Sequence, residues 1–428
     1  MKSFQSGSQT RRDWLKQGGK AAALAALPGC STRLVPVGQN TVKVGLLHSQ
    51  TGTMAISETS LRDAGLLAIE EINAAGGVLG YPIEPVVEDG RSRFSDEFPR
   101  QARKLLSDEK VAAVFGCWTS SSRKAVLPLF EQLNGLLFYP VQYEGNESSK
   151  NIIYTGATPN QQILPALDWF TSAAGGSHKR FYLVGADYVY PRTANFIVKK
   201  HLESHGVSVV GEQYAALGQQ DFKDIVNAIK KSDADIILST INGDSNLGFY
   251  SVLAAQGITA DRIPVLATSV GEDELRSLLP SQVQGHYSAW TYFQSLDNPQ
   301  NKRFVDLWKR EFGRDRVTDD PIEAAYTQVY LWKLAAEKAG SFEVDKVRKA
   351  LGSLAPFDAP SGKVKIDPKT QHMYKHFRLG KVREDRQFEI VHESPDWIAP
   401  FPYPQVAFPG WKCDWTSDGL TQGEPVAI

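Results

Sequence analysis

One short apolar run is followed by residues that suit the recognition of a small polar molecule. After Val111–Phe115 the chain continues through Trp118, Thr119 and Ser120 into a stretch with helical spacing. A hydroxyl side chain here would cap the first turn of that helix, and the free backbone N–H groups would suit an anion or a carbonyl oxygen. Trp118 would add a flat wall. The same pattern also suits an ordinary capping turn with a tryptophan packed between lobes.

Two further apolar runs also end in aromatic, hydroxyl-bearing residues. Tyr139 ends one of them and is followed by Val141 and Gln142, while Tyr188 and Tyr190 follow another. In an extended segment, alternate residues point to the same face, so the last two rings would lie on one side. Each tyrosine alone would be explained by ordinary packing. Three such strand ends in one chain favour a binding site.

Two acidic residues follow the remaining strand-like runs. Asp244 lies in a polar turn after residues 236–240, and Glu272 lies shortly after residues 265–267. In an open parallel sheet, ligands bind outside the carboxyl ends of the strands. We therefore expect the residues that follow these runs to line a common cleft.

The elements that position these residues alternate between strand and helix. Thr41–His48 is β-branched and apolar, and Ser57–Ala75 has apolar residues on one helical face before a Gly-Gly pair. The alternation continues to residue 157 and restarts after Thr158-Pro159. Short connections between alternating strands and helices indicate parallel sheets. The sequence therefore predicts an α/β chain with two lobes.

Signatures of enzymes and of metal sites are weak. The chain has no Walker A loop, no GxGxxG and no GxSxG motif. His201 and His205 have a metal-compatible i, i+4 spacing, but His205 is better explained by the helix dipole before Gly206. Cys117 is expected to be a buried, inert thiol, although pairing with Cys413 stays open. We therefore expect no catalytic residue, no cofactor and no metal.

Charge separates the first 29 residues from the rest. The chain has 428 residues and a net charge of −1, but residues 1–29 hold five basic residues and one acid. Without them the chain has 42 basic and 47 acidic residues, a net charge of −5. This balance excludes a nucleic-acid partner, and three cysteines exclude a disulfide framework. No apolar run reaches the 18 residues needed to span a membrane.

The first thirty residues resemble an export signal. Arg11-Arg12 precede an aromatic residue and a leucine, and residues 21–27 form a short apolar run. This order is typical of export signals, and the paired arginines resemble a Tat signal. The tetrapeptide ending at Cys30 resembles a lipobox. We expect residues 1–29 to be removed, Cys30 to carry a lipid, residues 30–40 to act as a tether, and the mature protein to reside in the periplasm.

Seven segments together resemble the urea-binding proteins of ABC transporters, within the short-chain amide-binding branch of the type I periplasmic binding proteins. The resemblance covers nearly all of the chain after residue 41. The segments are VGLLHSQTGTMA (44–55), EEINAAGGVLGYPIE (70–84), GCWTSSSRKAVLPLFE (116–131), LLFYPVQYEGNESSKNIIYTGATPNQQ (136–162), GADYVYPR (185–192), STINGDSN (239–246) and EAAYTQVYLWKLAAEKAG (323–340).

The resemblance implies two α/β lobes joined by three crossing strands and closing over a ligand. It divides the chain into a first lobe of residues 41–157 and about 290–355, and a second lobe of residues 158–289 and about 356–428, which includes the C-terminal tail. It implies ligand contacts by residues that follow the strands, namely Trp118, Thr119, Ser120, Tyr139, Val141, Gln142, Tyr188 and Tyr190. Asp244 and Glu272 fall in regions that line the second lobe in the wider family.

The function implied is the capture of urea and its delivery to a membrane permease, without catalysis. Relatives that sense amides inside the cell carry tyrosine in place of Trp118 and threonine in place of Val141. Short-chain amides and branched-chain amino acids therefore stay open as ligands on the same fold. An intracellular amide sensor and an amidase that uses Cys117 are the remaining alternatives.

Overall fold

The computed structural model describes residues 40–411 of the chain. The predicted export signal, Cys30, nearly all of the tether, Cys413 and the end of the tail lie outside these residues. Along the described part of the chain, every helix is too short or too polar to cross a membrane.

The first sheet has five parallel strands in the order β2-β1-β3-β4-β5. Its strands are β1 (Val42–His48), β2 (Ile83–Asp89), β3 (Val114–Gly116), β4 (Leu137–Tyr139) and β5 (Ile152–Tyr154). β1, β3, β4 and β5 are almost entirely buried and mostly apolar, as strands covered on both faces must be, whereas the edge strand β2 is partly exposed.

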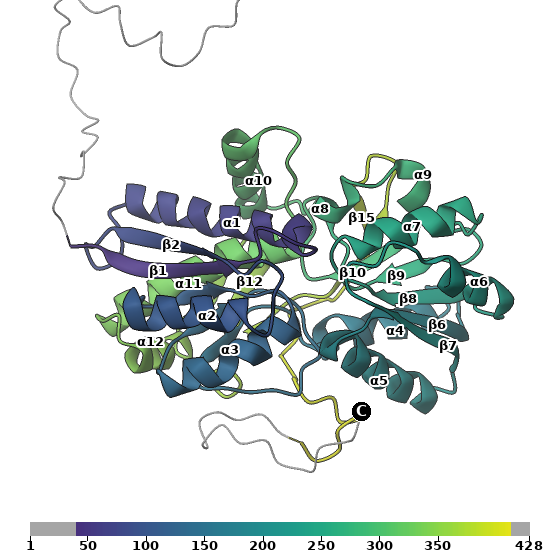
Figure 1. Cartoon of the computed structure of the whole chain (residues 1–428), viewed down its shortest axis with the longest axis horizontal. Helices are drawn as coiled ribbons and strands as arrows, with labels where there is room; N and C mark the ends of the chain where they lie inside the picture. Colours follow the sequence, from purple (N-terminus) through teal and green to yellow (C-terminus); the bar gives the residue numbers. More distant parts are fainter. Residues whose placement is uncertain (1–39, 412–428) are drawn as a thin grey trace, which may run out of the picture. The chain divides into compact units, whose positions relative to one another are not determined.

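Helices from two distant parts of the sequence cover this sheet. They are α1 (Ala55–Ala74), α2 (Glu97–Arg103), α3 (Ser120–Gln132), α10 (Pro299–Phe312), α11 (Asp320–Ala339) and α12 (Val344–Leu351). Figure 1 shows α11 and α12, in light green, among the purple and blue elements of the first sheet. The apolar stripe of Ala325, Val329, Trp332 and Ala336 joins the core of the first sheet, so the chain returns to it after building the second.

The second sheet has seven strands in the order β15-β14-β10-β9-β8-β6-β7, with β14 and β15 antiparallel to their neighbours. Its strands are β6 (Arg180–Ala186), β7 (Ser208–Ala215), β8 (Ile236–Thr240), β9 (Val265–Ala267), β10 (Tyr287–Trp290), β14 (Arg378–Val382) and β15 (Phe388–Glu393). Its helices are α4 (Ile163–Thr171), α5 (Val189–Ser204), α6 (Lys223–Lys231), α7 (Ser245–Ala255), α8 (Glu272–Leu275) and α9 (Pro280–Val283).

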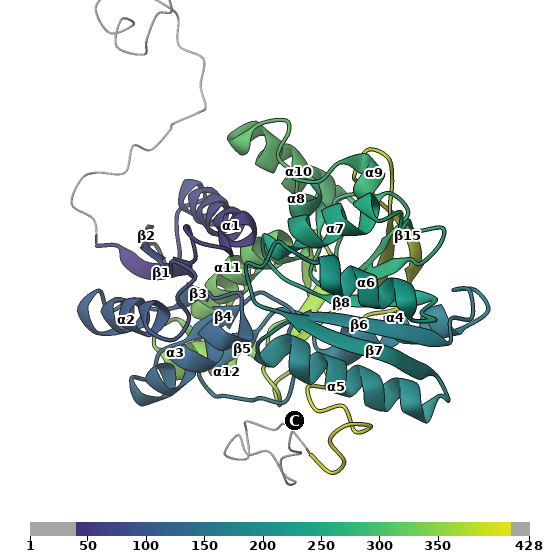
Figure 2. The ribbon, with the colours of Figure 1, turned by 45° about the vertical axis from the view of Figure 1, so that its right-hand side comes forward.

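Alternation of side chains along the strands gives the second sheet a separate core on each face. Tyr182 and Val184 of β6 pack with α6 and α7, whereas Phe181 and Leu183 pack with α4 and α5. Figure 2 shows α6 and α7 on one side of this sheet and α5 on the other.

A small third sheet is formed by the segment that follows α12 and precedes β14 in the sequence. It consists of β11 (Phe357–Ala359), β12 (Gly362–Ile366) and β13 (Met373–Tyr374). Its apolar residues Val364, Ile366 and Met373 belong to the core of the first sheet. The division of the lobes near residue 356 stays a prediction.

The strand order creates a reversal point in each parallel region. The chain goes from β1 outward to β2 and then back to β3, and it goes from β6 outward to β7 and then back to β8. Loops diverge at such points, which leaves a crevice at the carboxyl ends of the central strands. The predicted two-lobe α/β fold is confirmed, and the predicted site residues Trp118 and Tyr188 follow β3 and β6, at these reversal points.

Candidate functional site

The loop between β3 and α3 is held by a capped helix start. Thr119 is the N-cap of α3 in an extended conformation, and its hydroxyl oxygen accepts from the backbone N–H of Ser122 at 3.0 Å. Cys117 has a φ of 65°, a left-handed conformation that non-glycine residues rarely adopt. This turn directs the chain from β3 into Trp118, which is buried. The predicted capping role is thus confirmed and belongs to Thr119.

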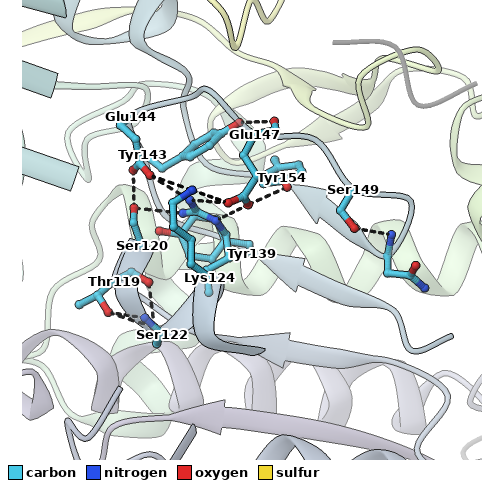
Figure 3. Close-up of polar contacts among 12 residues, drawn as sticks. Thr119, Ser120, Ser122, Lys124, Tyr139, Tyr143, Glu144, Glu147, Ser149 and Tyr154 are labelled. Carbon is cyan, nitrogen blue, oxygen red and sulfur yellow. Dashed lines mark hydrogen bonds and ion pairs between the residues drawn. The ribbon is translucent and has the colours of Figure 1, made fainter. Parts of the chain in front are cut away.

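Ser120 lies on a charged cluster formed by the buried residues Arg123, Glu144 and Glu147 and the partly exposed Lys124. Its hydroxyl donates to Glu144 and accepts from Arg123 Nη1 at 3.1 Å. Figure 3 shows Ser120 and Glu144 joined in this way, with Glu147 and Lys124 alongside. Because the hydroxyl proton points to Glu144, the Ser120 oxygen can present only a lone pair to a further partner.

The charges in this cluster compensate one another. Arg123 is fully buried, and it forms ion pairs with Glu144 at 3.2 Å and with Glu147 at 2.7 Å. Burial alone would raise the pKa of Glu147, but Arg123 and Lys124 outweigh it and lower the pKa to about 2. Lys124 lies 2.8 Å from Glu147. With two cations and two carboxylates, the cluster is neutral as a whole.

Aromatic rings surround the cluster and the loop before α3. The guanidinium of Arg123 lies 4.8 Å from the ring centre of Tyr139. The Tyr139 hydroxyl donates to the carbonyl oxygen of Trp118 at 2.5 Å, which fixes the backbone at the start of the site. Burial raises the pKa of Tyr139, so its hydroxyl stays protonated and acts as a donor.

Tyr188 and Tyr190 come to this cluster from the second sheet. Their ring centres are 6.3 Å apart at 41°. The segment is not the extended one that alternation suggested, because α5 begins at Val189, yet the rings remain neighbours. Burial raises the pKa of Tyr188, and so do the nearby Tyr190, Tyr139 and Glu144. The structure therefore brings Tyr139 of β4 close to the predicted tyrosines at the start of α5.

Gln142 connects the two sheets. Its Nε2 donates to the carbonyl oxygen of Thr268 and to the hydroxyl of Ser269, both at 2.8 Å. Tyr190 shares a hydrogen bond of 2.8 Å with the Thr268 hydroxyl. Burial raises the pKa of Tyr190 to about 12, although hydrogen bonding to Thr268, Ser269 and Gln142 opposes the rise. These residues form one polar group at the ends of β4, β6 and β9.

Val141 is placed by a close approach of two backbone segments. A Cβ on Gly156 would lie 1.9 Å from the carbonyl oxygen of Val141, so only glycine fits there. Val141 is itself buried.

Two buried polar atoms in this group are unpaired. Over residues 40–411, neither Trp118 Nε1 nor Gln142 Oε1 has a hydrogen-bond partner. Leaving a buried donor or acceptor unpaired costs about 1–3 kcal/mol, so such atoms are rare unless a ligand or water satisfies them. Trp118 Nε1 can only donate and Gln142 Oε1 can only accept.

The two predicted acidic residues, Asp244 and Glu272, contact residues outside the group formed by Trp118, Gln142 and Tyr190. Asp244 accepts from the hydroxyl of Thr53, and its backbone N–H donates to the Thr53 carbonyl at 3.3 Å. Glu272 accepts from the backbone N–H of Gln294 at 2.7 Å, and its second oxygen, Oε2, has no partner within the described chain. Burial raises the pKa of Glu272 to about 8. The recorded contacts of both acids lie outside the Trp118–Gln142 group, and their ligand role stays a prediction.

The arrangement also contains residues that the sequence did not predict, namely Arg123, Lys124, Glu144, Glu147, Thr268 and Ser269. Glu144 follows the same strand end as Gln142. Thr268 and Ser269 follow β9 directly, which was the available signal. Cys117 is buried, and burial raises the pKa of its thiol, so it fits the expected inert thiol.

A family model described as "Periplasmic binding protein domain" matches residues 42–408, nearly the whole described chain. The chain belongs to the periplasmic binding protein family. It is therefore the substrate-binding component of an ABC transporter, and this family implies an extracytoplasmic location. The relatives that match it over most of its length are named as solute-binding proteins.

Individual relatives of this periplasmic binding protein are distant in sequence. It is 24% identical over 372 residues to a Leu/Ile/Val-binding protein homolog of Brucella melitensis, covering 85% of this chain and 93% of the relative. It is 26% identical over 342 residues to a leucine-, isoleucine-, valine-, threonine- and alanine-binding protein of Pseudomonas aeruginosa, covering 77% of this chain and 87% of that protein.

Among solved structures, a solute-binding protein of an ABC transporter from R. palustris, in complex with 4-hydroxybenzoate, matches with a TM-score of 0.74. The two are 24% identical, and the match covers 84% of this chain and 98% of that one. The fold of this periplasmic binding protein is thus well matched. The ligands named for the two amino-acid-binding relatives and for the R. palustris protein all carry a carboxylate group. These comparisons therefore do not test the binding of urea.

Proposed function

We propose that this periplasmic binding protein captures a small neutral amide, with urea as the preferred member, and delivers it to a membrane permease. The observation that supports this ligand class is the pair of unpaired buried atoms at adjacent strand ends. One of them, Trp118 Nε1, requires an acceptor, and the other, Gln142 Oε1, requires a donor.

An amide carries both complementary groups within one small plane. Its carbonyl oxygen can accept from Trp118 Nε1, and its N–H groups can donate to Gln142 Oε1. The Ser120 oxygen, whose proton points to Glu144, offers a further acceptor. Urea has four N–H donors and one carbonyl, which suits a site with more acceptors than donors. Unsubstituted benzoate has neither an N–H nor an O–H donor at neutral pH, so it would leave Gln142 Oε1 unpaired.

Charge at the site also favours a neutral ligand over a carboxylate. The nearest cations, Arg123 and Lys124, are already compensated by Glu144 and Glu147. A bound carboxylate would bring an additional negative charge beside two glutamates. Burial of that charge without a free cation is costly.

A branched-chain amino acid is the second candidate. Its ammonium could donate to Glu272 Oε2, a buried oxygen without a partner in the described chain. Two curated relatives are named for binding such amino acids. An amino acid would still require a cationic or helix N-terminal partner for its carboxylate, and the start of α3 is the available one.

We propose that the mature protein lies in the periplasm, exported by the Tat-like signal in residues 1–29. Cys30 would then carry a lipid anchor, so that contact with the membrane would occur only there and at the permease. Neither a cofactor nor a metal is needed for ligand capture.

A calorimetric and thermal-shift panel on ligand-free protein tests the ligand class. The panel contains urea, acetamide, formamide, thiourea, leucine and benzoate, and the protein is first unfolded in guanidinium, dialysed and refolded to remove bound solute. We expect urea to bind with 1:1 stoichiometry and to raise the melting temperature most, because a ligand stabilises the state that it binds. Binding of leucine or benzoate without any amide would overturn the proposal. Ammonia release from urea or acetamide would support the amidase alternative instead.

A further inference from the structure

Three side chains that can ligate a metal gather on the outer helices of the second sheet. They are Asp168 on α4 and His201 and His205 at the end of α5. One ligand atom from each lies within 4.8 Å of the other two. The i, i+4 spacing of the histidines is visible in the sequence, but the aspartate comes from a separate helix 33 residues earlier.

The fold holds these side chains together from two independent elements. Leu167 of α4 and Leu202 of α5 pack in the same core on one face of the second sheet, which brings the two helices side by side. His201 Nε2 lies 2.7 Å from Asp168 Oδ1. The ring centres of His201 and His205 are 4.4 Å apart. An ion bound by all three side chains would take the place of the proton that His201 Nε2 shares with Asp168.

The hydrogen bond of His205 to the backbone selects the tautomer that a metal requires. Its Nδ1 lies 2.8 Å from the carbonyl oxygen of His201, and a carbonyl oxygen can only accept. Nδ1 therefore carries the proton, and Nε2 keeps its lone pair. Histidines that bind metals are commonly oriented by a hydrogen bond of this kind on the other ring nitrogen.

The location also favours a cation. The cluster lies in the last turn of α5, where the helix dipole attracts positive charge. The Asp168 side chain is 58% exposed and the His201 side chain 13% exposed, so an ion can reach them from solvent. His205 is exposed as well. Because Asp168 and His205 are exposed, they can bind an ion without leaving the hydrophobic core.

We propose that Asp168, His201 and His205 bind one divalent transition-metal ion of the Zn²⁺ class, with water in the remaining position. Two imidazoles and one carboxylate suit zinc, nickel or copper, whereas calcium and magnesium require oxygen ligands. The expected order of affinity is copper above nickel and zinc.

This metal site is separate from the proposed amide site. His201 follows Tyr190 by eleven residues along α5, which is roughly 16 Å along the helix axis. The proposal therefore does not depend on the identity of the solute.

Titration of the full chain with ZnCl₂ tests the metal site. The protein carries Cys30→Ser and Cys413→Ser, so that thiols outside the described residues do not bind zinc. We expect one zinc per chain by calorimetry and by equilibrium dialysis with metal analysis. His201→Gln with His205→Gln should abolish this saturable binding, and Asp168→Asn should weaken it by about tenfold or more.

His392→Gln is the matched control, since His392 is an exposed histidine on β15. This variant should keep the 1:1 binding unchanged. Circular dichroism and melting temperature show whether the variants at α5 remain folded. A chain that binds no zinc overturns the proposal, and so does zinc binding that persists in the folded double histidine variant.

Discussion

Gln142 donates to the carbonyl oxygen of Thr268 at 2.8 Å, which joins the end of β4 in the first sheet to the end of β9 in the second. Ser269 receives the other N–H of the same amide. Both donors of Gln142 are thus used between the sheets, and only its acceptor remains for a ligand. The residue that we propose as a ligand contact therefore also holds the two sheets together, and we expect ligand capture to depend on the contacts between them.

Hydrogen bonds between α1, beside the first sheet, and α8, beside the second, should also contribute to urea affinity, although they lie outside the proposed ligand site. Ser57 donates to Glu274 at 2.7 Å and Ser60 donates to Asp273 at 2.5 Å, from α1 to α8. We expect Ser57→Ala with Ser60→Ala to lower urea affinity by roughly ten- to thirtyfold, because the closed form loses two hydrogen bonds. Small-angle scattering should show a larger radius of gyration for the ligand-free variant.

Ser251→Ala is the control for closure. Ser251 accepts from Gln282 between α7 and α9, both helices of the second sheet. Its loss should leave affinity and scattering unchanged. Equal affinity and equal scattering in the Ser57/Ser60 variant would contradict the link between these contacts and capture.

Trp118→Phe tests the unpaired indole N–H directly. The substitution keeps an aromatic wall but removes the donor proposed for the ligand carbonyl, so urea affinity should fall by about tenfold. The melting temperature of ligand-free protein should change little, because Nε1 has no partner within residues 40–411. Calorimetry with urea and acetamide measures both ligands.

A second tryptophan supplies the control for this substitution. Trp332 of α11 also has a buried Nε1 without a partner in the described structure, but its ring packs against Phe115 and Phe342, away from the loops that follow β3 and β4. Trp332→Phe should therefore alter stability and leave affinity unchanged. A similar loss of affinity in both variants would remove Trp118 from the ligand site.

The sequence predicted the strand ends well and the pairings between them poorly. Alternating apolar runs indicate the parallel strands, and the rule that ligands bind beyond the carboxyl ends of such strands predicts Trp118 and Tyr188 as site residues. The sequence predicted neither the helix α4 nor the strands β5, β10 and β11 to β15, because their short or mixed patterns carry weak periodicity. Partner identity depends on contacts more than 100 residues apart, such as Gln142 with Ser269, which no local pattern encodes.

The contacts of the charged residues could not be predicted from the sequence for the same reason. Nothing local in the sequence pairs Glu144 with Ser120 and Arg123, since the pairing requires β3 and β4 to be neighbours in the sheet. Their positions after a strand predict Asp244 and Glu272 as site residues. The structure assigns Asp244 a contact with Thr53, which sequence position does not reveal.

Glu144→Gln should change the selectivity between amides and carboxylates. The charged cluster is neutral, so the loss of one carboxylate leaves a net positive charge beside Ser120. We expect the affinity for benzoate or acetate relative to urea to rise by about tenfold, an electrostatic effect of ~1.4 kcal/mol at these distances. Competition calorimetry with urea and benzoate measures the ratio.

Two controls accompany the Glu144→Gln experiment: the free energy of unfolding of the variant, and a substitution of another glutamate. Arg123 keeps Glu147 as a partner, so the variant should fold with a free energy of unfolding lower by about 1–3 kcal/mol. Glu131→Gln is the control, because Glu131 is an exposed residue of α3, the helix that carries Arg123. This variant should leave the affinity for benzoate relative to urea unchanged. An unchanged ratio in a folded Glu144→Gln protein would show that charge at this cluster does not select the ligand.

Glu272→Gln should change how stability depends on pH. Burial raises the pKa of Glu272 to about 8 from an ordinary value of 4.5. Between these values the folded protein binds a proton that the unfolded chain has released, so this group lowers the free energy of unfolding as pH rises. The slope for one proton is at most about 1.4 kcal/mol per pH unit. Glutamine keeps the oxygen that accepts from Gln294 and removes the titration.

Guanidinium unfolding at pH 5, 6, 7 and 8 measures this effect, since urea is excluded as a denaturant by its proposed role as ligand. The variant and the wild type should have similar free energies of unfolding near pH 5. The difference should then grow in favour of Glu272→Gln up to pH 8 and level off above it, because both states of the wild type are then deprotonated. Glu311→Gln, an exposed site on α10, should run parallel to the wild type. A Glu272→Gln curve that also runs parallel would mean that Glu272 is ionised in the folded protein throughout this range.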